Sequence, residues 1–158
     1  MGMDVFGKRP TAEVGEYFRN SVWWWHPLAD WLVGQFPMLT RKCRYWHSND
    51  GDGLNARQSL KLAEALQGAL QEGRVLRYAQ ERAATLELLP DEICGLCEGS
   101  GSRTDEIGRA HGFDSPGECN GCGGTGRVRP WETWYEFSED NVKDFTQFLN
   151  HCGGFRIC

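Results

Sequence analysis

Four cysteines stand in two matching motifs, CGLCEGSG at residues 94–101 and CNGCGGTG at residues 119–126. Both have the form C-x-x-C-x-G-x-G, in which the two thiols of one motif lie close together at a turn. Thiolates are favoured ligands of a structural Zn²⁺ ion, which takes four of them in a tetrahedron. The spacing therefore predicts one closed zinc site formed by four residues: Cys94, Cys97, Cys119 and Cys122.

The glycines that follow each second cysteine have a predicted role of their own. Gly99 and Gly101 in the first motif correspond to Gly124 and Gly126 in the second. We expect positive φ angles at these positions, which glycine adopts at little cost. Such turns would direct backbone N–H groups towards the sulfurs.

Two other uses of paired cysteines fit the sequence less well. A thioredoxin-like redox site places its C-x-x-C at a helix N-terminus after a strand, and neither motif has these flanks. A catalytic zinc ion keeps one coordination position open, whereas four thiolates fill all of them. A structural metal site is therefore the favoured interpretation.

The cysteine segment resembles the cysteine-rich zinc-binding domain of DnaJ-type chaperones over residues 94–128. Those chaperones carry four such modules and two zinc ions, so the resemblance implies a single ion for the two modules of this chain. His26-Pro27-Leu28 departs from the His-Pro-Asp signature of a J domain, so no co-chaperone activity is expected. Similar modules are found in small regulators such as the anti-TRAP inhibitor and some phage antiterminators, so the module does not fix the function.

The two ends of the chain carry a second resemblance. The stretches GMDVFGK and GGFRIC are similar to those of a family of phage and bacterial proteins. That resemblance implies a phage or prophage accessory protein, one that acts against a host system.

The composition narrows the classes of partner. The chain has 158 residues and a formal net charge of −5, which argues against a protein that coats nucleic acid. No apolar run approaches the ~20 residues that cross a bilayer, and the opening MGMDVFGKRP does not resemble a secretory leader. We expect a cytoplasmic protein with no membrane association, in an oligomeric state that the sequence leaves open.

The segment YWHSNDGDG, residues 45–53, is the alternative site. His47 with Asp50 or Asp52 could act as a base and its orienting carboxylate, which would suit a small hydrolase or a nucleotide-binding protein. A calcium loop is not expected, because Ser48 and Ser59 occupy the end positions where carboxylates are needed.

Tryptophan is unusually frequent near the N-terminus. Trp23, Trp24 and Trp25 are consecutive, so they cannot all face one core, and Trp46 follows later. At least one is expected at the surface, where tryptophan often contributes to binding a protein partner.

The remaining cysteines could form a second metal site. Cys43 and His47 are four residues apart, and Cys152 and Cys158 lie near the C-terminus. Buried, unpaired thiols are the commoner outcome for such residues.

Hydrophobic periodicity predicts an α+β fold. Helices are expected over residues 27–36, 55–73, 74–89 and 139–151, the last with Ser138 as its N-cap. Short strands are expected over residues 3–7, 127–137 and 155–158. We predict a single α+β domain over residues 1–158, with a zinc-binding subdomain inserted at residues 92–128.

These observations favour a non-enzymatic zinc-binding protein that acts by binding another protein. Two alternatives stay open. One is the small hydrolase or nucleotide-binding protein that uses the segment 45–53, and the other is a nucleic-acid regulator of the antiterminator type, which the acidic charge disfavours.

Overall fold

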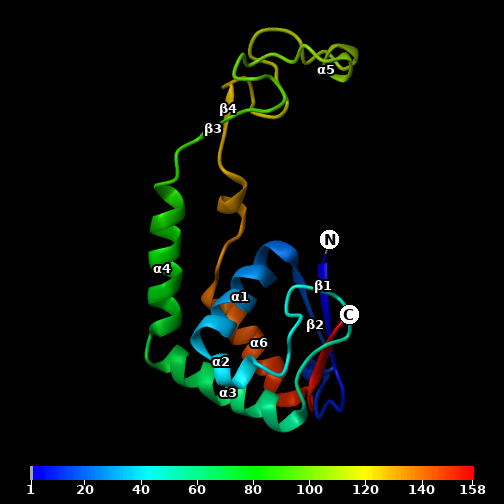
Figure 1. Ribbon diagram of the computed structural model, residues 1–158, viewed down its shortest axis with the longest axis vertical. Coiled ribbons are helices and arrows are strands. Elements are labelled where there is room, and N and C mark those ends of the chain that lie inside the picture. The colour runs from blue at the N-terminus through cyan, green and yellow to red at the C-terminus, as the bar shows by residue number, and fades with distance from the viewer. Residues whose placement is uncertain (1) are drawn as a thin grey trace. The chain divides into compact units, whose positions relative to one another are not determined.

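The computed structural model describes residues 2–158 and has the predicted α+β fold. The chain forms two compact units (Figure 1). One unit comprises residues 1–84 and 135–158, of which residue 1 is not described, and the other comprises residues 85–134. Among residues 2–158, no helix is both long enough and apolar enough to cross a membrane.

The first unit contains an antiparallel sheet of three short strands, in the order β2-β1-β5. These strands are β1 (Gly2–Gly7), β2 (Tyr17–Ser21) and β5 (Phe155–Ile157). The sheet therefore joins the two ends of the chain, because β5 pairs with β1 in register Val5 to Ile157. Strand β2 was not expected from the sequence.

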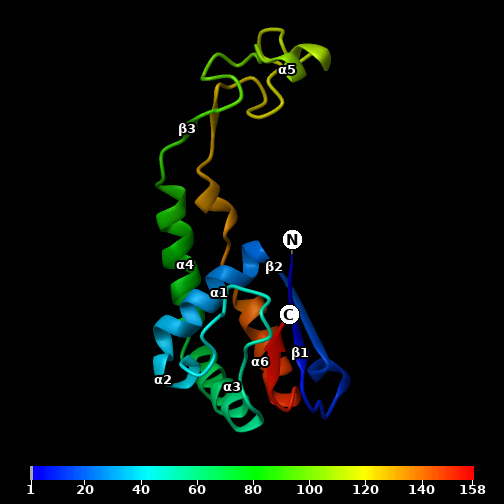
Figure 2. The same cartoon turned by 45° about the vertical axis from the view of Figure 1, so that its right-hand side comes forward.

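Helices supply most of the core of this unit. They are α1 (Val22–Gln35), α2 (Pro37–Thr40), α3 (Ala56–Gln71), α6 (Glu139–His151) and the start of α4 (Arg74–Glu87). Helices α3 and α6 pack against each other (Figure 2). Fully buried side chains between the helices and the sheet include Trp25, Leu28, Leu66, Phe145, Phe148 and Phe155.

Capping residues explain where two of these helices begin. Asn55 and Gln58 form a reciprocal capping box at α3, with bonds of 2.9 and 3.1 Å between each side chain and the other's backbone N–H. Ser138 accepts a hydrogen bond from the Asn141 N–H and caps α6, as predicted. Gly73 separates α3 from α4 with a φ of +68°.

Two sequence predictions about these elements need correction. Helix α1 begins at Val22, and Pro27 lies inside it rather than at its start; the turn before the proline carries Trp25 into the core. The strand predicted over residues 127–137 is wrong beyond Val128. There Pro130 ends β4 (Arg127–Val128), and a 3₁₀ turn, η2 (Trp131–Trp134), follows.

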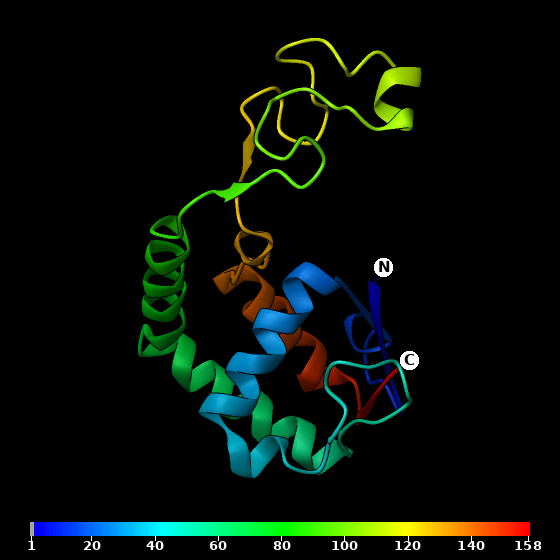
Figure 3. The same cartoon turned by 45° about the horizontal axis from the view of Figure 1, so that its top comes forward.

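The segment NDGDG runs along the free edge of β5 before it enters α3 (Figure 3). The Gly51 N–H donates to the Ile157 carbonyl at 2.7 Å, and the Ile157 N–H donates to the Asp52 carbonyl at 2.8 Å. A Cβ at Gly53 would lie 2.0 Å from the Phe155 carbonyl oxygen, so only glycine fits this approach. The glycines thus allow the segment to cover a sheet edge.

The second unit has little regular structure. It contains the two-residue strands β3 (Glu92–Ile93) and β4, which pair with each other, and α5 (Glu106–Ala110). Its buried apolar cluster consists of Cys94, Cys97 and Cys119, with Cys122 and Val128 packed against it. Such a small cluster cannot replace a hydrophobic core, so this unit needs another source of stability.

Candidate metal centre

The four predicted cysteines meet in the second unit. Their Sγ atoms all lie within 4.8 Å of one another, with Cys94 and Cys119 at 3.9 Å and Cys97 and Cys122 at 3.7 Å. A tetrahedral zinc ion with zinc–sulfur bonds of about 2.3 Å places its sulfurs about 3.8 Å apart. The sulfurs are therefore positioned to hold a metal ion, and their spacing suits zinc.

The two motifs have the same backbone conformation, 25 residues apart. Each contains three residues with positive φ after its second cysteine. The pairs are Glu98 and Gly123 at +51° and +59°, Gly99 and Gly124 at +89° and +84°, and Gly101 and Gly126 at +77° and +76°. The prediction for the four glycines is therefore confirmed.

The turns direct backbone N–H groups at the sulfurs. The Gly101 N–H donates to Cys97 Sγ at 3.3 Å, and the Gly126 N–H donates to Cys122 Sγ at 3.2 Å. Hydrogen bonds of this kind stabilise the ionised sulfur, which is the form that binds metal.

The two motifs also bond to each other in a reciprocal way. The Cys94 N–H donates to the Gly126 carbonyl at 2.9 Å, and the Cys119 N–H donates to the Gly101 carbonyl at 3.0 Å. Each motif thus places the first cysteine of the other, which gives the site a local two-fold pseudosymmetry. The four sulfurs are held by both motifs together.

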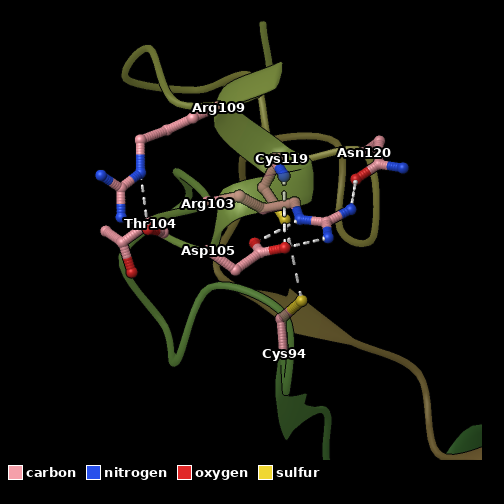
Figure 4. A network of polar contacts seen from close by, with 8 residues as sticks. Cys94, Arg103, Thr104, Asp105, Arg109, Cys119 and Asn120 are labelled. Carbon is pink, nitrogen blue, oxygen red and sulfur yellow. Dashed lines mark hydrogen bonds and ion pairs between the residues drawn. The ribbon is translucent and has the colours of Figure 1, made fainter. Parts of the chain in front are cut away.

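A buried arginine lies beside the sulfurs (Figure 4). Arg103 makes two hydrogen bonds to the Asp105 carboxylate, at 2.7 and 2.5 Å, and a third to Asn120 Oδ1 at 3.0 Å. The hydrogen bonds to Asp105 raise the pKa of Arg103, and the nearby Cys119 and Cys94 act in the same direction. A cation at this place offsets the negative charge of four thiolates.

Asp105 holds Arg103 in place and also caps α5, where its side chain accepts the Gly108 N–H. The Arg103 guanidinium lowers the pKa of Asp105 to about 2. A Cβ at Gly108 would lie 2.3 Å from Arg103 Cβ, so the glycine permits the close packing. Sequence reasoning missed this group, because nothing in the stretch SRTDEIG marks Arg103 as buried.

The cysteines differ in their tendency to ionise. Burial raises the pKa of the Cys119 thiol to about 11. Burial acts in the same direction at Cys122, but hydrogen bonds from the Gly126 N–H and from neighbouring thiols outweigh it and lower the pKa to about 6. A cation entering the site would therefore find an ionised ligand at Cys122 at neutral pH.

The predicted tryptophans divide between core and surface. Trp25 and Trp46 are buried with stacked rings 6.1 Å apart, and Trp25 Nε1 donates to the Trp46 carbonyl at 2.5 Å. Trp23 and Trp24 remain 36% and 40% exposed. The expectation that at least one of the three consecutive tryptophans is exposed is confirmed.

The structure does not assemble His47 with either predicted carboxylate. His47 Nε2 lies 2.9 Å from Asp30 Oδ1 of α1, and the His26 ring lies 4.7 Å from the His47 ring. Asp50 accepts a hydrogen bond from the Ser48 hydroxyl. Asp52 accepts backbone N–H groups of the preceding segment, including that of Arg44 at 2.5 Å. The predicted pairing is wrong because both loop carboxylates stabilise the turn itself.

The remaining cysteines do not form a second site. Within residues 2–158, the four-cysteine cluster is the one group of three or more potential ligands with metal spacing. Cys43 and Cys152 are buried, and burial raises the pKa of both thiols, that of Cys43 to about 12. They pack as neutral apolar groups.

The fold and the cysteine cluster thus define an α+β protein with a candidate four-thiolate metal centre. No protein-family model, curated protein or solved structure matches the chain. The cysteine cluster agrees with the metal binding that the DnaJ-type motif implies. The resemblance of the chain to DnaJ-type chaperones rests on the motif residues alone, because no family model matches.

Proposed function

We propose that this protein binds one structural Zn²⁺ ion through Cys94, Cys97, Cys119 and Cys122. The sulfur geometry carries the proposal, because four cysteines from two matched turns lie at the spacing of a zinc tetrahedron. The ion would stabilise the segment 92–128, which has only a small apolar cluster of its own.

Metal content tests this proposal directly. Protein purified under reducing conditions should hold one zinc per chain, and the Co²⁺-substituted protein should show the strong visible absorption of tetrahedral thiolate coordination. Replacing Cys97 or Cys122 with serine should reduce the zinc content, whereas Cys43→Ser, which removes a thiol outside the cluster, should not. A chain that retains zinc after both cluster substitutions would contradict the assignment.

The proposal includes the way in which the protein acts. Four thiolates leave the metal no open position, so the ion would shape the protein rather than perform catalysis. We infer a non-enzymatic cytoplasmic protein that binds a protein partner, and the exposed Trp24 supports a contact surface on α1. The phage or prophage role, directed against a host system, rests on the resemblance of the chain ends alone.

Capture from a host extract tests partner binding. The zinc-loaded protein should retain a specific host protein, and Trp24→Ala should weaken that retention while preserving the unfolding temperature. Equal retention by Trp24→Ala would exclude this tryptophan from the surface. The purified complex would then show whether the contact lies in the second unit instead.

A further inference from the structure

A cavity of about 530 Å³ lies in the first unit. Residues of helix α1, helix α2 and the segment 41–48 form its wall. Its volume is within the range of about 300–1,000 Å³ that is typical of small-molecule sites.

The floor of the cavity is neutral and largely apolar. Thr40, Cys43 and Trp46 line it and are each at most 3% exposed. The Thr40 hydroxyl donates to the Phe36 carbonyl at 2.9 Å, and burial raises the pKa of Cys43 to about 12, so that thiol stays protonated. The floor therefore suits an uncharged, planar part of a ligand.

The rim of the cavity has an excess of positive charge. Arg41 and Arg44 are exposed there, and neither guanidinium has an ion-pair partner among residues 2–158. The one carboxylate of the lining, Asp30, is engaged with His47 at 2.9 Å. Asp52 accepts the Arg44 backbone N–H at 2.5 Å, and its carboxylate attracts the Arg44 guanidinium without forming a direct ion pair with it.

This charge contrasts with the formal net charge of −5 for the chain. Two unpaired guanidiniums at one cavity are therefore a local feature and do not reflect a generally basic surface. Arginine forms paired hydrogen bonds to phosphate oxygens, which makes a phosphate group the ligand chemistry that such a rim fits best.

We propose that this cavity binds a phosphate monoester with a planar aromatic body, of the size of a mononucleotide. Arg41 and Arg44 hold the phosphate, while Tyr45, which is 57% exposed at the rim, and the apolar wall contact the ring. The inference does not depend on zinc, since every residue that carries it lies between positions 30 and 48.

Calorimetric titration of the zinc-loaded protein tests this site. The probes are the four common nucleoside 5′-monophosphates, the matching nucleosides and inorganic phosphate. At least one monophosphate should bind with a Kd below about 1 mM, and its nucleoside should bind at least about tenfold more weakly. Inorganic phosphate alone should also bind more weakly, because it lacks the ring.

The double variant Arg41→Gln/Arg44→Gln should weaken binding by at least about tenfold, since it removes both charge-assisted contacts to the phosphate. Lys42→Gln is the matched control, because it removes one charge from the same segment at a residue outside the lining. The proposal is overturned if no monophosphate binds in this range, if a nucleoside binds equally well, or if Lys42→Gln weakens binding as much as the double variant does. Unchanged thermal unfolding of the variants would show that the site, and not the fold, was altered.

Discussion

Gly101 and Gly126 occupy equivalent places in the two cysteine motifs and each performs the same two tasks. The N–H of each glycine donates to the second cysteine of its own motif, and the carbonyl of each accepts the N–H of the first cysteine of the other motif. The metal centre is therefore built by two copies of one turn that bond to each other.

Substitution of Gly101 should disrupt this arrangement. A Cβ there would lie 2.4 Å from the Gly124 carbonyl oxygen, and φ is +77°, so Gly101→Ala combines a backbone clash with strain. We expect the zinc-loaded second unit to lose more than about 2 kcal/mol of unfolding free energy. The loss can be measured by denaturant unfolding monitored by NMR signals of residues 85–134.

Substitutions at two other glycines of the same unit distinguish the effect of the clash from the effect of the strain. Gly112 has a φ of +75° but no atom within 4 Å of its added Cβ, so Gly112→Ala should cost about 1 kcal/mol from strain alone. Gly95 has neither constraint, and Gly95→Ala should change stability by less than about 0.5 kcal/mol. Equal losses for all three variants would contradict the role given to the clash.

Arg103 should increase the retention of the metal. Removing the buried cation with Arg103→Gln leaves the thiolate charge uncompensated, and we expect metal affinity to fall by roughly tenfold or more. Competition with a chromophoric chelator measures the affinity. Arg109→Gln is the control, because its exposed guanidinium donates to the Thr104 carbonyl, and its loss should leave the affinity unchanged.

The consecutive tryptophans should differ sharply in their contribution to stability. Trp25 is fully buried and bonds to the Trp46 carbonyl, so Trp25→Ala should cost about 3–5 kcal/mol. Trp24→Ala should cost less than about 1 kcal/mol, because its side chain is 40% exposed and because the hydrogen bond from Asn141 Nδ2 is accepted by the Trp24 backbone carbonyl, which alanine retains. Urea unfolding of the two variants compares them, and similar losses would refute the assignment.

His26 should titrate below the ordinary histidine value. Burial lowers its pKa from 6.5, the charge on His47 acts in the same direction, and Asp30 opposes both. The unfolded chain binds the proton more tightly, so this contribution to stability is present above pH 6.5 and is lost as pH falls through the lowered pKa. NMR titration of the His26 ring gives the midpoint, and His47→Gln should raise it. A midpoint at or above 6.5 would show that burial does not control this group.

Local sequence signals predicted much of the fold. Ser138 marks a helix start through its own side chain, and Gly73 separates two helices through its own backbone freedom. Each of these effects acts within a few residues, so it can be read from a short stretch of sequence. Strand β2 carried no comparable signal, because its place depends on pairing with β1.

The candidate metal centre was predicted for a related reason. The ligand set follows directly from the spacing of Cys94, Cys97, Cys119 and Cys122, and the glycines indicate where the turns lie. Arg103 was missed because its burial follows from contacts with Asn120 and Phe113, which lie far from it in the chain.

The sequence by itself therefore determined the α+β class, most helix boundaries and the four cysteines, since these depend on local propensity and on ligand spacing. The tertiary structure alone decided that His47 lies against Asp30, that Trp25 faces the core while Trp24 does not, and that Arg41 and Arg44 border one cavity. Such relationships depend on the packing of segments that are distant in the chain, which no local pattern specifies.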